Sequence, residues 1–338
     1  MKLLIVGYNQ PGQMGHYLMS AAAKIDIDHD IVDAAEAEAS SRIGQAFYWR
    51  LRGKKPAHLH RFSTVVVERC TVSKPDVVLT TGIRAPLKAA HISALRESGI
   101  KVINYSTDDP WNKVLSAPWF LSALPAYDAV FSPRRANFSE FRKAKVRALY
   151  YLPFGYDPDV HRPWPNGAPG APRSDLLFVG GCDSERQPLI SALADAGLEL
   201  ALFGRYWDRH AKTRRFWRGV ADQETIRAAT ATTGISLCLV RRANRDGHVM
   251  RSYEAAAIGG CLLAEDTSDH RELLGPEGCA AQYFANPSEL VAKARKLAAD
   301  ADARGRLAQR LRERMVARRD TYADRLSEML KLSTDTLR

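Results

Sequence analysis

The sequence has 338 residues, of which 46% are hydrophobic and 26% charged, and its formal net charge is +11. This length suits two domains of roughly 150 residues each, and the composition is that of an ordinary globular protein. No apolar run approaches the roughly 20 residues of a membrane span, and the opening segment 1–9 turns polar too early for a signal peptide. The positive charge predicts an anionic partner: nucleotide phosphates, an acidic membrane face or nucleic acid.

The cysteines are five in number and scattered, with no Cys-x-x-Cys pair and no histidine at a metal-binding spacing. They are Cys70, Cys182, Cys238, Cys261 and Cys279. This pattern indicates reduced thiols and excludes a zinc site of the usual spacing. We therefore expect a cytoplasmic protein without a bound metal, with peripheral contact at the inner membrane face as an option.

The chain opens with a predicted strand at 2–7, a glycine-containing loop and a helix at 17–25. This order is typical of the first βα unit of a doubly wound sheet. Because the spacing is not Gly-x-Gly-x-x-Gly, it does not support a dinucleotide cofactor. We expect Gly12 and Gly15 to form an acceptor loop that a ligand approaches closely. His16 is a candidate polar or catalytic contact, and a solvated histidine in the first helical turn is the alternative.

The stretch 43–61 mixes aromatic and basic side chains. Such a mixture can bind phosphates, single-stranded nucleic acid or an anionic membrane surface. The run is short and isolated, which makes the nucleic-acid interpretation weak. An insertion beside an acceptor pocket is the other interpretation.

Two acids follow the predicted strand at 101–106, which comes after an earlier strand at 75–82. The carboxyl ends of parallel strands are where α/β folds bind ligands. Asp108 and Asp109 are therefore candidates for an acceptor contact or a catalytic base. Because Pro110 follows them, ordinary turn chemistry is the alternative.

A proline- and glycine-rich stretch at 150–172 separates two regions of alternating strands and helices. The pattern predicts an α/β protein with two Rossmann-like domains and a cleft between them. We assign 1–155 to an acceptor domain, 156–173 to a linker and 174–315 to a donor domain. The remaining segment, 316–338, is predicted to be a helix that crosses back to the first domain. One helical tail, broken near Gly305, is expected over 290–330.

The second half contains the strongest candidate site, at 246–266, which is predicted to form a loop, a helix and a strand. Asp246 and Glu254 flank Arg251 at the start of that helix. Helix amides facing a loop can bind an anion, and a nearby carboxylate can accept hydrogen bonds from ribose hydroxyls. An amphipathic helix with a charged, solvated start is the alternative. His248 is included with the donor-binding residues, although His248, His210 and His270 have no partners visible in the sequence, which favours surface or loop roles for each.

Several motifs in this half together resemble one family. They are Phe178-Val-Gly-Gly-(x)4-Arg186, Phe203-Gly204-x-x-Trp207, Arg251-Ser-Tyr-Glu254-Ala-Ala-Ala-x-Gly259 and Thr321-Tyr322-x-x-Arg325, preceded by Leu152-Pro-x-Gly155-x-Asp157-(x)3-His161. The order and spacing resemble the CgeB-type enzymes of the "glycosyltransferases group 1", which have the GT-B fold. The resemblance covers mainly 150–330.

This resemblance implies a metal-independent transfer of a sugar from a nucleotide diphosphate sugar, with retention of the anomeric configuration expected. Glu254 would accept hydrogen bonds from the ribose, and Asp246 would lie near the sugar or its phosphate. The basic residues would neutralise the diphosphate leaving group. The donor-binding candidates are Gly180, Gly181, Arg186, Arg205, Asp246, His248, Arg251 and Glu254. The acceptor, whether glycan, lipid, protein or small molecule, is not specified, and Trp207 is expected in the core.

Two other classes of function are open at this point. One is a sugar-nucleotide epimerase on the same fold, with Asp108 or Asp109 facing the sugar. The other is a non-catalytic protein that binds glycans or a membrane surface. Nothing in the sequence matches a nucleic-acid-binding motif.

Overall fold

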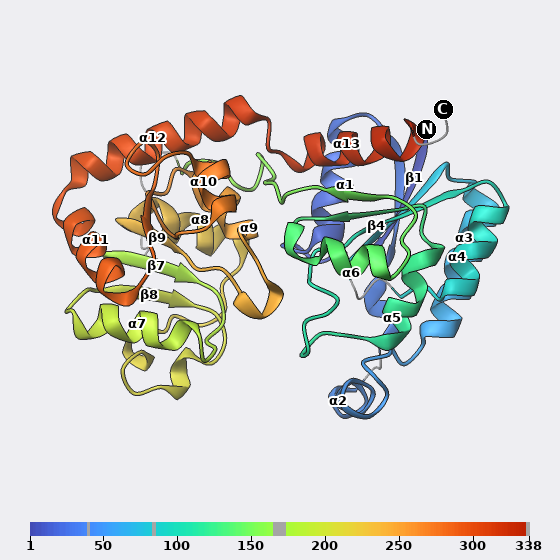
Figure 1. Ribbon diagram of the computed structural model, residues 1–338, viewed down its shortest axis with the longest axis horizontal. Helices are drawn as coiled ribbons and strands as arrows, with labels where there is room; N and C mark the ends of the chain where they lie inside the picture. The colour runs from blue at the N-terminus through green and yellow to red at the C-terminus, as the bar shows by residue number, and fades with distance from the viewer. Residues whose placement is uncertain (39–40, 83–85, 165–173, 336–338) are drawn as a thin grey trace. The chain divides into compact units, whose positions relative to one another are not determined.

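The computed structural model describes residues 1–38, 41–82, 86–164 and 174–335, and it divides into two compact units (Figure 1). Unit 1 contains Met1–Pro153, Ala243–Arg245 and Tyr322–Arg338, and unit 2 contains Phe154–Arg242 and Asp246–Thr321. The divisions therefore fall after Pro153 and Thr321 rather than at the expected 155 and 315. A local reason is that the Phe154 amide bonds to His248 and Tyr156 bridges to Thr321, both within unit 2.

Unit 1 is built on one parallel sheet with the strand order β2-β1-β3-β4-β5-β6. Its strands are β1 (Lys2–Gly7), β2 (Asp28–Asp33), β3 (Val77–Thr81), β4 (Lys101–Tyr105), β5 (Ala129–Ser132) and β6 (Leu149–Tyr151). Its helices are α1 (Met14–Lys24), α2 (Arg42–Leu51), α3 (Leu59–Ser73), α4 (Ala89–Glu97), α5 (Pro118–Ala123), α6 (Phe138–Lys143) and α13 (Tyr322–Asp335), with short 3-10 turns at Ala34–Ala37, Leu124–Ala126 and Arg135–Asn137. Helix α13 packs on α1, where the rings of Tyr17 and Tyr322 stack with centroids 5.0 Å apart.

Unit 2 repeats this design with the strand order β11-β10-β9-β7-β8, again all parallel. Its strands are β7 (Leu176–Val179), β8 (Leu200–Phe203), β9 (Ile235–Cys238), β10 (Leu262–Glu265) and β11 (Gln282–Phe284). Its helices are α7 (Arg186–Asp195), α8 (Gln223–Thr232), α9 (Met250–Ile258), α10 (Ser268–Leu274), α11 (Pro287–Ala299) and α12 (Ala301–Arg318), with 3-10 turns at Trp207–Arg209, Arg214–Phe216 and, reaching into unit 1, Arg242–Asn244. Helix α7 packs with α11, while α9 packs with α8 and α12.

Strands β3, β8, β9 and β10 are short runs in which every residue is buried, as expected of parallel strands covered on both faces. The edge strands β2 and β6 of unit 1 are less buried. The predicted α/β fold with two Rossmann-like sheets is therefore confirmed. In each sheet the strand order reverses beside its first strand, between β1 and β3 in unit 1 and between β7 and β9 in unit 2. Ligands of doubly wound folds bind at the carboxyl ends of the strands at such a reversal.

The expected single tail broken near Gly305 is wrong. Helix α11 ends at Ala299, and α12 then runs without a break through Gly305 to Arg318. The Asp300 carboxylate starts α12 by accepting a hydrogen bond of 2.8 Å from the Ala303 amide. Gly305 is exposed, and a Cβ added to it would meet no other atom within 4 Å, so the helix tolerates the glycine at a cost of about 1 kcal/mol.

Candidate donor site

The glycine turn after β7 is held by the residues of a second motif. The Trp207 indole donates a hydrogen bond of 2.8 Å to the Gly180 carbonyl, and its ring packs edge-on against Phe178. Gly204 lies directly on the same carbonyl, since a Cβ added to Gly204 would be 2.2 Å from Gly180 O. The expectation that Trp207 belongs to the core is confirmed, because its exposure is 0%. Gly180 and Gly181 thus shape the turn that leads to α7.

We expect Gly204→Ala to lower the free energy of unfolding by about 2 kcal/mol or more. Two effects add: Gly204 has a φ of +138°, which side chains disfavour, and the new methyl group would overlap a backbone carbonyl. Chemical denaturation would measure the loss. Gly197→Ala is the matched control, because Gly197 has a φ of +81° in open space. Equal losses in the two variants would contradict the packing explanation.

Arg186 is the first residue of α7 and is only 7% exposed. The Asp183 carboxylate caps this end by accepting from the amides of Glu185 and Arg186, at 3.0 and 2.8 Å. The guanidinium lies over the Phe178 ring, 5.7 Å from its centroid, and its Nη1 is 3.6 Å from Asp183. Its Nε is buried without a hydrogen-bond partner. Burial lowers the pKa of Arg186, and the charges of Arg241 and Asp246 act on it from nearby.

The other candidate of this turn, Arg205, differs from Arg186 in its surroundings. Its side chain is exposed, while its carbonyl accepts a hydrogen bond of 2.9 Å from the Cys182 amide. The backbone of Arg205 therefore helps to hold the glycine turn. Its side chain lies at the carboxyl end of β8, one strand away from β7.

The loop before α9 is fastened to the start of α10. The Thr267 hydroxyl donates to the Gly247 carbonyl at 2.5 Å, and a Cβ on Gly247 would be 2.3 Å from the Asp269 carboxylate. His248 lies 3.4 Å from Asp269 through Nδ1, and its Nε2 accepts from the Phe154 amide at 3.4 Å. His248 is buried and engaged on both ring nitrogens, so it positions the loop that carries Asp246.

Glu254 lies on α9 with a side chain that is almost completely buried. Its Oε2 is 2.6 Å from Nη1 of Arg251, and its Oε1 is 3.6 Å from Nε2 of His161. Because Nδ1 of His161 accepts from the Asp157 amide at 3.0 Å, the neutral ring carries its proton on Nε2, the nitrogen nearest the carboxylate. Burial lowers the pKa of His161, opposed by the charge of Glu254. The ion pair lacks hydrogen-bond geometry: Glu254 Oε2 and Arg251 Nε and Nη1 are buried polar atoms without a hydrogen-bond partner.

His161 was not among the candidate site residues. The spacing Asp157-(x)3-His161 was the available signal, since a backbone amide and a ring four residues apart can meet. What the sequence does not indicate is that this ring reaches Glu254, which lies 93 positions further along the chain. The structural role of His161 follows from the burial of its ring beside the Glu254 carboxylate.

A hollow of about 330 Å³ opens beside Arg186. Its wall includes Glu185, Arg186, Leu239, Val240, Glu265 and Phe284. Leu239 and Val240 follow β9, Glu265 and Phe284 end β10 and β11, and Glu185 and Arg186 lie at the start of α7, so the hollow lies at the carboxyl ends of the strands. Glu265 is engaged there, since it accepts from the Val240 amide at 3.1 Å and from Arg242 at 2.7 Å.

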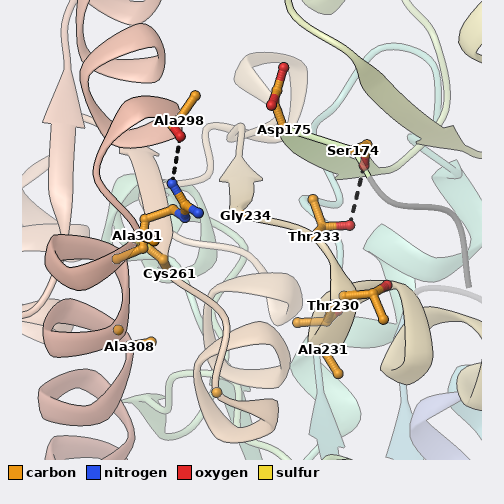
Figure 2. Close-up of a pocket in the computed structure, with 14 residues that line it drawn as sticks. Ser174, Asp175, Thr230, Ala231, Thr233, Gly234, Cys261, Ala298, Ala301 and Ala308 are labelled. Carbon is orange, nitrogen blue, oxygen red and sulfur yellow. Dashed lines mark hydrogen bonds between the residues drawn. The ribbon is translucent and has the colours of Figure 1, made fainter. Parts of the chain in front are cut away.

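A second hollow, of about 360 Å³, lies at the opposite edge of the same sheet (Figure 2). It is lined by residues that precede β7, β9 and β10, among them Ser174, Thr233 and Gly234. Arg304 faces it while donating to the carbonyls at the end of α11, including Ala298 O at 2.8 Å. Because this is the amino edge of a parallel sheet, it is not the place where such a fold binds nucleotides.

His270 lies in α10 and joins this helix to α9 and to the end of β10. Its Nδ1 lies 2.8 Å from the Glu265 carbonyl and its Nε2 2.8 Å from the Ser252 hydroxyl. A carbonyl can only accept, so the neutral ring carries its proton on Nδ1 and accepts from Ser252. Burial lowers the pKa of His270 to about 4. The surface alternative is wrong for His270 and for His248, because both side chains are buried. The loop alternative is wrong for His270, which lies in α10, whereas His248 does lie in the loop before α9.

We expect the free energy of unfolding to fall as the pH drops from 6.5 to 4. In this window the unfolded chain binds a proton on His270 that the folded chain excludes, because the pKa is 6.5 unfolded and about 4 folded. Each pH unit then costs on the order of 1 kcal/mol, while above pH 6.5 the full contribution is present. Urea unfolding at several pH values would measure it. The His270→Asn variant should show a shallower slope, and identical slopes would contradict this assignment.

The unit 1 candidates lie at the carboxyl ends of β1 and β4. Gly12 has a φ of +84°, and a Cβ on Gly15 would be 2.6 Å from the Tyr8 carbonyl, so both glycines allow the tight turn into α1. His16 is half-buried as the third residue of α1. These three residues are brought together as one turn.

Asp109 is a structural residue rather than a free carboxylate. It is 1% exposed and holds Arg245 with both oxygens, at 2.6 and 3.0 Å, while also accepting from the Trp111 amide. These bonds raise the pKa of Arg245. Asp108 is less buried and accepts from Asn244 at 3.1 Å. We therefore keep Asp108 as an acceptor-side candidate and withdraw Asp109. Arg245 and Asn244 were not predicted, because they lie 136 positions away.

Comparison with solved structures shows which proteins share the fold of this chain. Sucrose-phosphate synthase from Thermosynechococcus elongatus superposes with a TM-score of 0.70 at 14% identity, over 99% of this chain and 98% of that one. HepE from Anabaena, in complex with UDP and glucose, gives 0.67 at 13% identity over 99% of both chains. BGT from phage T4, in complex with UDP and Mn2+, gives 0.61 at 13% identity over 98% of this chain and 99% of that one. No curated protein sequence matches the chain.

The chain therefore has the GT-B fold, as predicted. Residues 186–331 match the family model described as "Glycosyl transferase-like". The recognition of a glycosyltransferase from its motifs is confirmed. The narrower CgeB-type assignment stays a prediction.

Proposed function

We propose that the protein transfers a sugar from a nucleotide diphosphate sugar, with UDP as the first candidate, to an acceptor that is still to be identified. One observation carries the proposal: buried cationic atoms without hydrogen-bond partners, on Arg186 and Arg251, at the carboxyl edge of the unit 2 sheet. Such atoms suit the oxygens of a diphosphate. HepE and BGT, which share the fold, are described in complex with UDP.

The residues of unit 2 then take distinct roles. Arg186 and Arg251 hold the diphosphate, together with the positive amino end of α9. Glu254 accepts from the ribose hydroxyls, kept in place by His161. Asp246 lies next to the transferred sugar or its phosphate, on the loop fastened by Thr267 and His248.

We further propose that these cations neutralise the departing diphosphate without a metal ion. Within the described part of the chain, no three His, Cys, Asp or Glu residues are arranged to hold one. BGT, however, is described with Mn2+. Activity that survives EDTA would support the proposal, and activity restored only by Mn2+ would overturn it. The resemblance favours retention of the anomeric configuration, which NMR of the product would decide.

The acceptor side is less defined and rests on Asp108, His16 and the turn of Gly12 and Gly15. We propose a cytoplasmic enzyme, which agrees with five free cysteines. Among the described residues no helix is both long and apolar enough to cross a bilayer. A lipid-linked acceptor would bring the enzyme to a membrane surface all the same.

Thermal unfolding of the full chain with nucleotides tests the donor proposal. A ligand at a hundred times its dissociation constant stabilises the folded state by about 2.7 kcal/mol. UDP and its sugar conjugates should raise the melting temperature, whereas uridine and NAD should not. Stabilisation by another nucleoside diphosphate would change the base and keep the reaction class. If no nucleoside diphosphate and none of their sugar conjugates raised the melting temperature, the proposal would be overturned.

A further inference from the structure

Helix α2 of unit 1 exposes an apolar stripe that the described residues of its unit leave largely uncovered. Ile43, Phe47 and Leu51 are 84%, 46% and 72% exposed. They are spaced four residues apart, which places them on one face of the helix. Scattered exposed apolar residues are ordinary, but a continuous stripe on one helix marks an interaction surface. In Figure 1, α2 stands off from the sheet of its unit, near the bottom of the view.

The helix is nevertheless capped at its start and anchored to its unit after its end. The Ser41 hydroxyl caps its start by accepting from the Gly44 amide at 3.0 Å. After its end, Lys54 donates to the Ser116 carbonyl at 2.8 Å, and the Trp119 indole donates to the Lys54 carbonyl at 3.1 Å. These bonds anchor the segment beside α5. The stripe itself makes none of these contacts and is left open.

All charged residues in the sequence on either side of the stripe are basic. Between Glu38 and Glu68 the sequence has no Asp or Glu, while it has six Lys or Arg residues, namely Arg42, Arg50, Arg52, Lys54, Lys55 and Arg61. Arg50, Arg52 and Lys55 are exposed. A helix with an apolar stripe and flanking cations is the pattern of an element that lies in a membrane interface.

The positive charge of this surface indicates which kind of partner covers it. A second copy of the chain would bring the same cations against one another, and a single helix of 10 residues offers little of the roughly 1,200 Å² that a stable pair buries. An acidic bilayer satisfies both halves of the pattern, since lipid tails cover the stripe and anionic headgroups attract the cations.

We propose that α2 docks unit 1 on the surface of an anionic lipid bilayer, with Ile43, Phe47 and Leu51 entering the headgroup region and Arg50, Arg52 and Lys55 facing the lipid phosphates. This surface lies outside the donor site and does not depend on the nature of the nucleotide. It would hold the enzyme where a lipid-borne acceptor is presented.

Flotation of the full chain with vesicles tests the inference. We expect the protein to float with phosphatidylcholine vesicles that contain phosphatidylglycerol, and not with phosphatidylcholine alone or in high salt. Phe47→Ser combined with Leu51→Ser should abolish flotation. Arg50→Gln with Arg52→Gln should weaken partitioning by about fivefold for each cation removed. Val72→Ser, which changes another exposed apolar residue of unit 1, and Arg306→Gln with Arg310→Gln are the matched controls and should float normally.

Three results would overturn the inference: no flotation of the wild type, equal flotation with neutral vesicles, or equal loss in the controls. If the protein forms a dimer in solution and Phe47→Ser dissociates it, the stripe is an interface with a second copy of the chain, and the inference is also overturned. Melting temperatures of all variants with and without UDP report on folding and on the donor site. Vesicle binding and nucleotide binding can therefore fail separately.

Discussion

Glu254→Ala is expected to lower the free energy of unfolding by about 3–5 kcal/mol, the usual result of breaking a buried ion pair. The carboxylate is 1% exposed between Arg251 and His161, and its removal leaves a buried cation without its partner. Urea unfolding of the variant and the wild type would measure the loss. A loss below about 1 kcal/mol would show that the carboxylate is not part of the core.

Because the alanine variant changes folding, the binding role of Glu254 needs Glu254→Gln, which keeps the shape and removes the charge. If Glu254 accepts from the ribose, the wild type should prefer UDP to 2′-deoxy-UDP, and the glutamine variant should lose much of that preference. Asp320→Asn is the control, since Asp320 is also a buried carboxylate of unit 2 that pairs with an arginine, Arg318, at 2.8 Å. It should lose stability and keep the preference. An unchanged preference in Glu254→Gln would leave Glu254 with a structural role alone.

Arg186→Ala is expected to weaken the binding of UDP by about 30-fold or more, because truncating one member of a buried charge pair costs about 2–5 kcal/mol. The free protein should lose little stability, since the nearest carboxylate is 3.6 Å away and Nε has no hydrogen-bond partner. Calorimetric titration with UDP, UMP and uridine would measure the effect.

The ligand series separates a phosphate role from a general one. The loss should be largest for UDP, smaller for UMP and absent for uridine, whereas Arg306→Ala, an exposed cation on α12, should bind all three normally. Equal losses for UDP and uridine would remove Arg186 from the phosphates and assign it to the base or to the fold.

The sequence predicts the strands and helices of this protein well and their long-range contacts poorly. Buried parallel strands are recognisable because each is a short apolar run closed by a glycine or an acid, as at Gly180 or Asp108. The contact of His161 with Glu254, and that of Asp109 with Arg245, join positions far apart in the chain, which no local pattern reveals. Asp109 was therefore proposed as a base although both its oxygens are engaged.

Gly305 shows that a local sequence pattern can also predict a break that the fold does not contain. A glycine was expected to break the terminal helix, but the capping carboxylate of Asp300 decides where α12 begins, and the apolar positions Leu307, Leu311 and Met315 keep it packed. Packing of one helical face outweighs a local preference of about 1 kcal/mol.

The contact between Gly204, Trp207 and the Gly180 carbonyl has a consequence for how relatives of this chain should be interpreted. These residues carry two of the motifs by which the family is recognised, yet the structure uses them as scaffold. A descendant that kept the glycines and the tryptophan but lost Arg186 or Glu254 would keep the scaffold of this turn and match the rest of these motifs, without the groups proposed to hold a donor. The proposed donor binding in such sequences is better judged from Arg186, Glu254 and His161 than from the glycines and the tryptophan.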